Sequence, residues 1–203
     1  ILIWETMLWL KILLLISFSA FSQESKFYVG FGGGFASKGG DLSTYAYSNG
    51  ISLNFLNLGY RFNETFGATV NLNTSGHRFI DYSSVGIAYL SIGGIVSVPI
   101  GKFTWDIKPQ YAPRVFGAYD DETLVALDIY EFLLFGRGFV FGNSLVRTNK
   151  KGFTWSLDLD YLTSYFNEAR IDGLYYEDGS TYNSFRIRVG VRYNFEFKQK
   201  TLY

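Results

Sequence analysis

Residues 185–197 alternate apolar and polar side chains without a break. Every second residue from Phe185 to Phe197 is apolar, and arginine, glycine, asparagine or glutamate stands between them. Successive side chains of a β-strand point to opposite faces, so one face of this strand meets hydrocarbon and the other meets water or paired charge. The run exceeds the usual strand of about 5–6 residues and suffices for the roughly 9–11 residues of a tilted strand that crosses a bilayer. The pattern predicts a membrane β-barrel.

The beginning of the chain predicts export. From Met7 the sequence gives one positive charge at Lys11, a short apolar run and then Ala20-Phe21-Ser22, with small residues where a signal peptidase reads them. The uninterrupted apolar run is about ten residues, whereas a spanning helix needs ~20. We therefore expect residues 1–22 to comprise upstream residues and a cleavable signal peptide, and residues 23–203 to form the barrel domain.

Composition narrows the class further. The chain has no cysteine, which excludes a lipoprotein anchor and structural disulfides. Aromatic residues make up 20% of the chain and glycines number 22 of 203, as suits a barrel with aromatic girdles and closely packed strands. The formal net charge is +0 and no block of Lys or Arg occurs, so we expect no nucleic-acid partner.

The mature chain contains eight segments that alternate in the manner of strands. In the second, the apolar parity changes between Phe55 and Leu56, which predicts a bulge. In the fifth, Pro109 lacks a backbone donor, which predicts a bulge or a local distortion. The sixth is the hardest to place, because its apolar residues occupy both parities. The expected strands are residues 26–36, 51–62, 65–73, 86–100, 103–112, a segment within 127–142, 153–161 and 185–197.

The connections between these segments alternate in length. Long polar stretches follow the first, third, fifth and seventh strands, and two-residue turns follow the second and fourth. The connection after the sixth, residues 143–152, is of moderate length. Short turns on one side and long loops on the other are typical of outer-membrane barrels, whose long loops lie outside the cell. The predicted fold class is all-β: an eight-stranded antiparallel up-and-down transmembrane β-barrel preceded by a cleavable signal peptide.

Several short motifs resemble a known family. They are the signal at residues 7–22, Leu-Gly-Tyr-Arg-Phe at 58–62, Val-Ser-Val-Pro-Ile at 96–100 and Arg-Tyr-Asn-Phe at 192–195. In these the mature chain resembles the small outer-membrane β-barrel proteins, which include the OmpX/OmpA-like eight-stranded barrels and the PorT-like barrels. The resemblance implies the outer membrane of a Gram-negative bacterium, contact with its lipid and lipopolysaccharide, and the barrel assembly machinery as a partner during biogenesis.

A soluble eight-stranded carrier of the lipocalin type would alternate in the same way, with its polar face outward. Many Lys and Glu would then be expected on that face, whereas Gly, Ser, Thr and Asn predominate there. The Gly-x-Trp opening and trailing helix of lipocalins are also absent from the sequence. We therefore favour the membrane barrel and keep a secreted lipocalin-like ligand carrier as an alternative.

In a membrane barrel the polar faces of the strands line the interior. Eight strands enclose a space that side chains fill, and buried charges need partners to offset their desolvation. We expect a paired network in a filled polar lumen rather than a pore; a proton or ion path is the alternative. The candidate lumen charges are Arg61, Asp106, Lys108, Asp158, Asp160, Arg186, Arg188, Arg192 and Glu196.

Catalytic and metal-binding patterns are weak. The one histidine, His77, lies near Ser75 in a stretch that we interpret as a loop. Some small barrels deacylate lipid A with a His/Ser pair, in which the histidine activates the serine, but their His-x-Ser order is reversed here. Acidic residues cluster at 120–122 and 177–178, where we expect ordinary solvated loops. We predict no enzyme activity, no cofactor and no metal site.

The exterior loops are the remaining candidates for function, because aromatic residues are common at recognition surfaces. We predict a non-enzymatic integral outer-membrane barrel that acts structurally or through these loops, by adhesion to or recognition of a surface or envelope-complex protein. The alternatives are an accessory barrel of an envelope secretion or motility complex and a lipid A-modifying barrel enzyme. The candidate loop contacts are Tyr45, Tyr47, Phe79, Tyr82, Tyr119, Tyr175, Tyr176 and Tyr182.

Overall fold

Nine strands make up most of the chain that the computed structural model describes, residues 26–41, 49–78, 84–120, 132–147 and 152–196. Within these residues no helix is long and apolar enough to cross a membrane. The expected signal peptide lies outside the described residues and stays a prediction. The strands are β1 (Lys26–Ala36), β2 (Gly50–Arg61), β3 (Phe66–Arg78), β4 (Ser84–Ile100), β5 (Phe103–Asp120), β6 (Phe132–Arg147), β7 (Gly152–Ile171), β8 (Leu174–Glu177) and β9 (Thr181–Glu196).

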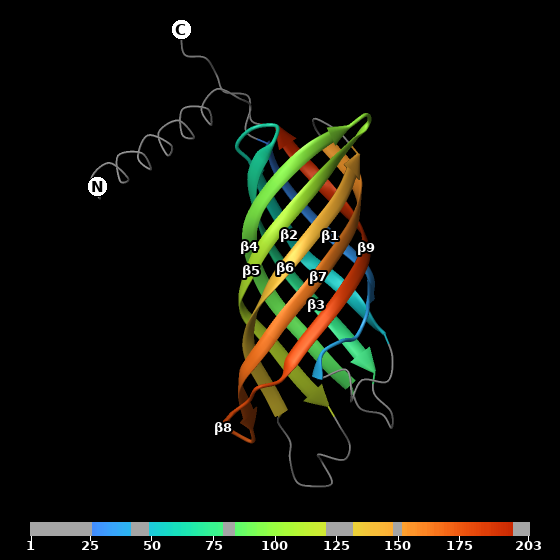
Figure 1. Ribbon diagram of the computed structural model, residues 1–203. Helices are drawn as coiled ribbons and strands as arrows, with labels where there is room; N and C mark the ends of the chain where they lie inside the picture. The colour runs from blue at the N-terminus through green and yellow to red at the C-terminus, as the bar shows by residue number, and fades with distance from the viewer. Residues whose placement is uncertain (1–25, 42–48, 79–83, 121–131, 148–151, 197–203) are drawn as a thin grey trace, which may run out of the picture.

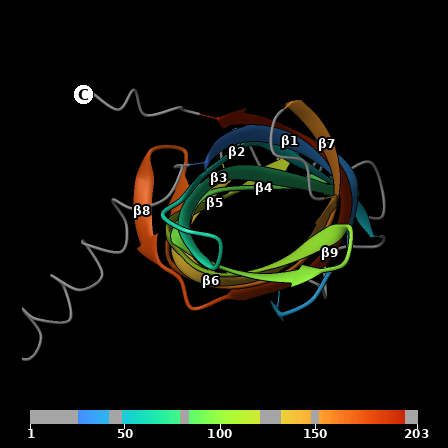
Figure 2. The ribbon, with the colours of Figure 1, turned by 90° about the horizontal axis from the view of Figure 1, so that it is seen from above.

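All the strands except β8 close into a ring (Figure 1). Neighbours are antiparallel and follow the order β6-β5-β4-β3-β2-β1-β9-β7, and β6 pairs with β7 to complete the circle. The short strand β8 pairs with β7 alone among the described strands and stands beside the ring when the barrel is viewed along its axis (Figure 2). The predicted eight-stranded antiparallel barrel is confirmed.

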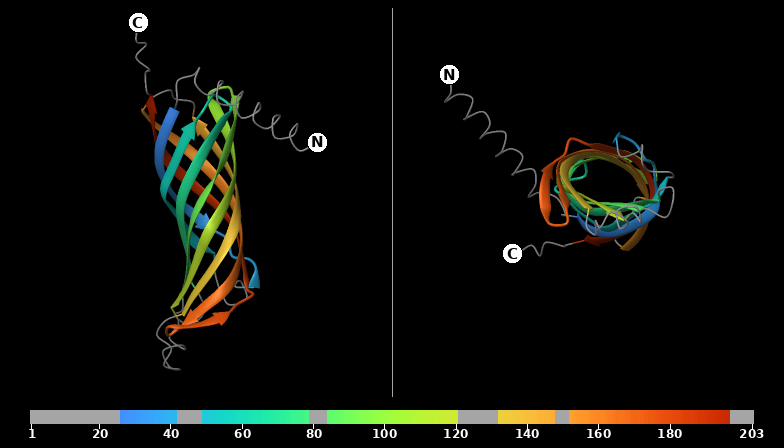
Figure 3. Two further views of the ribbon diagram at one scale, coloured as in Figure 1. Left: turned by 90° about the vertical axis from the view of Figure 1, so that its left-hand side faces the viewer. Right: turned by 90° about the horizontal axis from the view of Figure 1, so that it is seen from below.

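The two ends of the barrel differ. The tight β2–β3 and β4–β5 connections lie at one end, together with the start of β1 and the end of β9, and we call this the turn end. The β7–β8 hairpin lies at the opposite end, which we call the loop end (Figure 3). This arrangement is the predicted alternation of short turns and longer connections.

Side chains alternate between the exterior and the interior of the ring. In β7, Phe153 and Trp155 are 71% and 65% exposed, whereas Thr154 between them and Ser156 after them are buried. The same pattern leaves large apolar side chains exposed on all the ring strands. Water would not favour such an exterior, but hydrocarbon does. The barrel is therefore built to be embedded in a membrane, and its exterior does not fit the lipocalin-like alternative.

Several strands are longer than predicted. β3 ends at Arg78, β5 at Asp120 and β7 at Ile171, each well inside a stretch that we expected to be a loop. β6 continues to Arg147, so only residues 148–151 connect it to β7. The polar residues that suggested loops lie where the strands project beyond the apolar belt. Beyond the belt the strands remain paired, but their outward side chains no longer face hydrocarbon and can be polar.

The predicted irregularity in β2 is confirmed. Asn54 pairs with Asn73 and Leu56 with Leu72, which leaves Phe55 as the extra residue of a bulge. An extra residue reverses the parity of the side chains that follow it. Phe55 and the residue after it therefore both face away from the interior, and the apolar face stays outward along the whole strand.

Pro109 distorts the β4–β5 ladder, as predicted. Pairing passes from Gly93–Gln110 to Val96–Ile107 with no pair assigned between them, although the register is unchanged. Proline has no N–H to donate to the ladder. The β4–β5 ladder is therefore interrupted beside Pro109.

The interior has two zones. Toward the turn end it is lined by charged, amide and hydroxyl side chains, as predicted for the lumen. Toward the loop end it is apolar, so the expected polar lumen describes only part of the interior. The sequence does not reveal this zone, because β4 and β6 are apolar on both faces. The apolar cluster consists of Val85, Ile87, Tyr89, Ala112, Val115, Leu134, Val140, Leu162, Phe166, Ala169 and Tyr182.

A charge on the outward face of β9 tests the membrane placement. Val189 lies near the middle of β9 and is 56% exposed. We expect Val189→Lys to destabilise the barrel in lipid vesicles by roughly 2–4 kcal/mol, the cost of a lysine near the bilayer midplane. The measurement is a urea titration of refolding, read from the faster gel mobility of the unboiled barrel. Tyr175→Lys on β8, beyond the ring, is the control. Equal stability of Val189→Lys and the unchanged protein would contradict the placement.

Candidate functional site

Ion pairs and hydrogen bonds join the charged side chains of the interior into a network. The part of this network nearest the turn end is centred on Asp106 of β5, whose side chain is fully buried. Arg61 Nη2 donates to both of its carboxylate oxygens, at 2.7 and 2.9 Å. Arg192 Nη1 and Ser97 Oγ donate to it at 3.1 and 2.8 Å. Two guanidinium groups, from β2 and β9, therefore share this one carboxylate.

Asp158 on β7 forms the second centre. Arg192 Nη2 donates to it at 2.9 Å, so this arginine bridges Asp106 and Asp158 across the interior. Lys108 Nζ lies 3.6 Å from the same carboxylate. The hydroxyl groups of Ser144 and Ser156 also donate to it. Charge-assisted hydrogen bonds of this kind are stronger than neutral ones.

A third layer lies further toward the loop end. Arg188 forms an ion pair with Asp160. Its Nη1 atom also donates to Asn73 Oδ1 at 2.6 Å. In the same part of the interior, Gln110 Oε1 accepts hydrogen bonds from Asn71 and Ser91 at 2.7 and 2.8 Å. These contacts join β3, β4, β5, β7 and β9 through side chains alone.

Arg186 stands where the polar and apolar zones meet. Its side chain is fully buried, its Nη1 atom donates to the Tyr89 hydroxyl, and its guanidinium lies 4.7 Å from the centre of the Tyr89 ring. By register Asp160 is its cross-strand partner, yet that carboxylate pairs with Arg188. Among the described residues, an aromatic ring takes the place of a carboxylate beside Arg186.

The structure therefore places the expected lumen charges inside the barrel, with one exception. The side chain of Glu196 lies outside the described part of the chain, although its backbone belongs to β9 and pairs with Lys26. The carboxylates of β7 contact arginines of β9 in the Asp158–Arg192 and Asp160–Arg188 ion pairs.

His77 does not lie in a loop, contrary to our interpretation. It belongs to β3, and its side chain is buried at the loop end of the interior. Its Nε2 atom lies 2.6 Å from the Tyr182 hydroxyl, which lies 3.3 Å from Ser75 Oγ. The tyrosine hydroxyl thus stands between serine and histidine, and the group faces the interior rather than the lipid. The arrangement does not favour deacylation of a lipid in the surrounding membrane.

The same contacts correct the expectation for Tyr182. We expected it to be an exterior-loop contact, but it is 2% exposed and lies within β9, pointing into the barrel. β9 begins at Thr181, earlier than the strand that the alternation of 185–197 predicted. The residues on either side of Tyr182 are polar, so the alternation of apolar and polar residues does not show that Tyr182 points inward.

Two of the expected loop aromatics are exposed on β8: Tyr175 by 63% and Tyr176 by 48%. Sequence reasoning placed them in a loop and missed the hairpin strand. The side chain of Tyr119, in β5, lies outside the described residues. The other expected contacts that lie outside the described residues are Tyr45, Tyr47, Phe79 and Tyr82.

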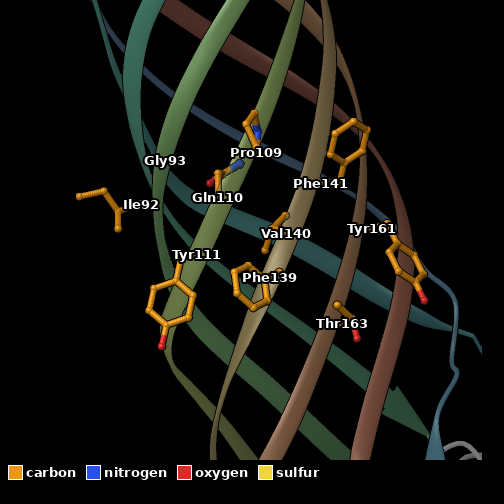
Figure 4. Close-up of a pocket in the computed structure, with 10 residues that line it drawn as sticks. All are labelled: Ile92, Gly93, Pro109, Gln110, Tyr111, Phe139, Val140, Phe141, Tyr161 and Thr163. Atoms are coloured by element: carbon orange, nitrogen blue, oxygen red, sulfur yellow. The ribbon is translucent and has the colours of Figure 1, made fainter. Parts of the chain in front are cut away.

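The outer wall contains an apolar hollow of about 480 Å³ beside Pro109, where the β4–β5 ladder is interrupted (Figure 4). Tyr111 and Phe139 lie at its side nearer the loop end, and Gln110 and Val140 contribute from the inward face of the wall. The remaining lining residues are Ile92, Gly93, Pro109, Phe141, Tyr161 and Thr163. Within the described residues no group of three His, Asp or Glu side chains could hold a metal ion.

Breaking the central ion pairs should destabilise the barrel. Asp106→Asn leaves Arg61 without its carboxylate partner and removes one of the two carboxylates that Arg192 contacts. Removal of one partner from a buried pair costs roughly 3–5 kcal/mol, so we expect a loss of that order in the free energy of unfolding in detergent micelles. Glu177→Gln on the exposed strand β8 is the matched control. If both variants unfold at the same urea concentration, the network does not stabilise the fold.

Three solved outer-membrane proteins are similar to this structure. Neisserial surface protein A (NspA) gives a TM-score of 0.56 at 13% identity, over 83% of this chain and 97% of that chain. The outer membrane protein OprG from Pseudomonas aeruginosa gives 0.53 at 10% identity, over 86% and 97%. Ail, the attachment invasion locus protein of Yersinia pestis, gives 0.51 at 11% identity, over 84% and 100%.

No family model matches the sequence, and no curated protein matches it. At 10–13% identity the three structures establish a common fold and nothing beyond it. That fold is the one that the resemblance in the sequence implied. With its apolar exterior and its paired interior charges, the chain has the fold of the small outer-membrane β-barrel proteins.

Proposed function

We propose that this protein is a non-enzymatic outer-membrane barrel that recognises a partner at its loop end, with the β7–β8 hairpin as the main contact. The observation that carries the proposal is the free edge of β8, which pairs with β7 and with no other described strand. The loop end of such barrels lies outside the cell. A free edge there is a template on which a strand from another protein can pair.

The hairpin geometry directs specific backbone groups away from the barrel. Asp172-Gly173 forms a two-residue turn with φ angles of 47° and 85°, as a type I′ turn requires. The flanking residues, Ile171 and Leu174, are partners in the ladder. In such a hairpin the flanking pair exchanges both hydrogen bonds and the next pair exchanges none. The N–H and C=O groups of Tyr175 therefore face the free edge.

The base of the hairpin is fixed to the barrel. Phe166 N–H donates to the carbonyl of Ser180 at 2.9 Å, just below β8. The carboxylate of Asp41 accepts hydrogen bonds from the N–H and the hydroxyl of Thr181, at 3.0 and 2.9 Å. These hydrogen bonds fix the position of the hairpin, and with it the free edge of β8, relative to the barrel.

The side chains of the hairpin are those of an interaction surface. Leu174, Tyr175 and Tyr176 are 64%, 63% and 48% exposed. Aromatic side chains are enriched in protein interfaces, and an apolar patch beyond the lipid belt has no membrane to cover it. A protein segment in extended conformation would cover both the side chains and the backbone edge.

A polyanion is a less suitable partner for this hairpin. Ail has been crystallised in complex with the heparin analogue sucrose octasulfate. Here the hairpin carries Glu177 and Asp178 as well as Arg170, whose guanidinium lies 5.9 Å from the centre of the Tyr175 ring. Mixed charge of this kind does not favour a highly sulfated ligand.

Two variants separate the contributions of backbone and side chain. Tyr175→Pro removes the free-edge donor, and Tyr175→Ser removes the aromatic ring but keeps the donor. We expect the proline variant to lower capture of extended peptides and protein-coated surfaces by about tenfold, the loss expected when one edge hydrogen bond of roughly 1.5 kcal/mol is removed. The measurement is retention of cells that display the protein, with surface exposure checked by protease accessibility.

Val189→Ala, on the lipid-facing side of the ring, is the control for display. If Tyr175→Pro and the control bind equally, the strand-addition proposal is wrong. If Tyr175→Ser alone loses binding, the partner is recognised by side-chain contacts rather than by pairing with β8.

A further inference from the structure

Two exposed arginines lie side by side on the outer wall of the barrel. The β5–β6 ladder passes from Ala112–Gly138 to Val115–Gly136, so Arg114 lies opposite Arg137. Both are exposed, and neither forms an ion pair with a described residue. Glu168, on β7, pairs with Phe135, two ladder pairs beyond Arg137–Tyr165, and forms no ion pair with Arg137. Like charges that face each other across a ladder destabilise a sheet unless an anion lies between them.

A bulge in β5 is the reason that Arg114 points outward. Ala112 and Val115 are both fully buried, and the two residues between them, Pro113 and Arg114, are both exposed. Without the extra residue, strict alternation would direct Arg114 into the interior. Bulges commonly re-aim a side chain in this way, and Pro113 suits one because it has no N–H to pair. The sequence analysis did not predict this bulge.

The two arginines lie at the loop-end edge of the apolar belt. On β6, Arg137 and the exposed Arg147 at the turn end are ten positions apart. A strand that crosses a bilayer needs roughly 9–11 residues, so the two cations of β6 bracket the hydrocarbon. Arg114 is eleven positions from Phe103, the first residue of β5. Both Arg114 and Arg137 therefore lie at the depth of lipid headgroups.

A groove runs from Arg137 into the belt. A second hollow, of about 470 Å³, is lined by Arg137 and Tyr165. It shares Tyr111, Phe139 and Thr163 with the hollow beside Pro109, and these three residues lie together at one side of that hollow (Figure 4). The two hollows adjoin at these three residues, with the Arg137 cation in the hollow nearer the loop end and mostly apolar side chains along the rest.

We propose that this surface binds a phosphorylated lipid of the outer leaflet, with the phosphate on Arg114 and Arg137 and an acyl chain in the groove. Guanidinium groups bind phosphate through paired, charge-assisted hydrogen bonds. At the loop end the leaflet is the outer one, so the lipid class is lipid A of lipopolysaccharide. The inference rests on the outer-membrane placement in the proposed function, but not on the hairpin.

The test is a titration of the barrel in detergent micelles, followed by native mass spectrometry. The probes are bisphosphorylated lipid A, the same lipid without phosphate, and inorganic phosphate alone. The variants are Arg114→Gln/Arg137→Gln, which keeps the length of the side chains, and Thr163→Trp, which fills the groove where the hollows meet. Arg147→Gln removes an exposed arginine from the other end of β6 and is the matched control.

We expect the double variant to bind bisphosphorylated lipid A about tenfold less tightly than the control, since two charges near an anionic surface are lost. Thr163→Trp should weaken binding of both lipids. Equal binding by the double variant and the control would overturn the proposal, as would equal binding of both lipids by the unchanged protein. Inorganic phosphate that displaces lipid A at a similar concentration would show an ion site rather than a lipid site.

The outcomes also separate this inference from the proposed function. Tyr175→Pro lies outside the groove and should leave lipid binding unchanged. A folded barrel that loses surface capture with this change but keeps its preference for phosphorylated lipid supports both proposals. A barrel that runs at the same gel mobility boiled and unboiled would contradict the membrane placement on which both rest.

Discussion

Backbone groups in hydrocarbon have no water to pair with, so the closure of the ring is the constraint on which the rest of the structure depends. The β1–β9 and β6–β7 ladders remove every open edge from the eight ring strands. Closure by eight strands also fixes a narrow interior. In so narrow a space Arg192 can reach Asp106 on β5 and Asp158 on β7 at once, which ties opposite walls together.

The ion pairs and ring contacts of the interior charges support a structural role for them. Arg61, Lys108, Arg188 and Arg192 are all held by carboxylates, and Arg186 is held by an aromatic ring. Beyond it, the described interior toward the loop end is lined by the apolar cluster around Val115 and Leu162. The two proposed recognition sites, the free strand edge and the arginine pair at the edge of the lipid belt, therefore both lie on the outside of the barrel.

The sequence was most informative where one face of a strand had to be apolar. The bounds of β1, the bulge at Phe55 and the inward direction of the lumen charges all followed from a period of two. It was least informative beyond the belt, where either face can be polar, so the ends of β5 and β7, the strand β8 and the burial of His77 were missed. The outward direction of Arg114 depends on a bulge whose only local sign is a proline.

The turn at Asp172-Gly173 has a consequence for how tightly a partner could bind. Both residues already occupy the left-handed backbone region, and the four ladder pairs of β7 and β8 are formed before any partner arrives. Ordering a backbone residue costs about 1–2 kcal/mol of conformational entropy. On this edge that loss falls on the incoming segment alone. A stiff or pre-extended segment would therefore bind more tightly than a flexible one of the same sequence.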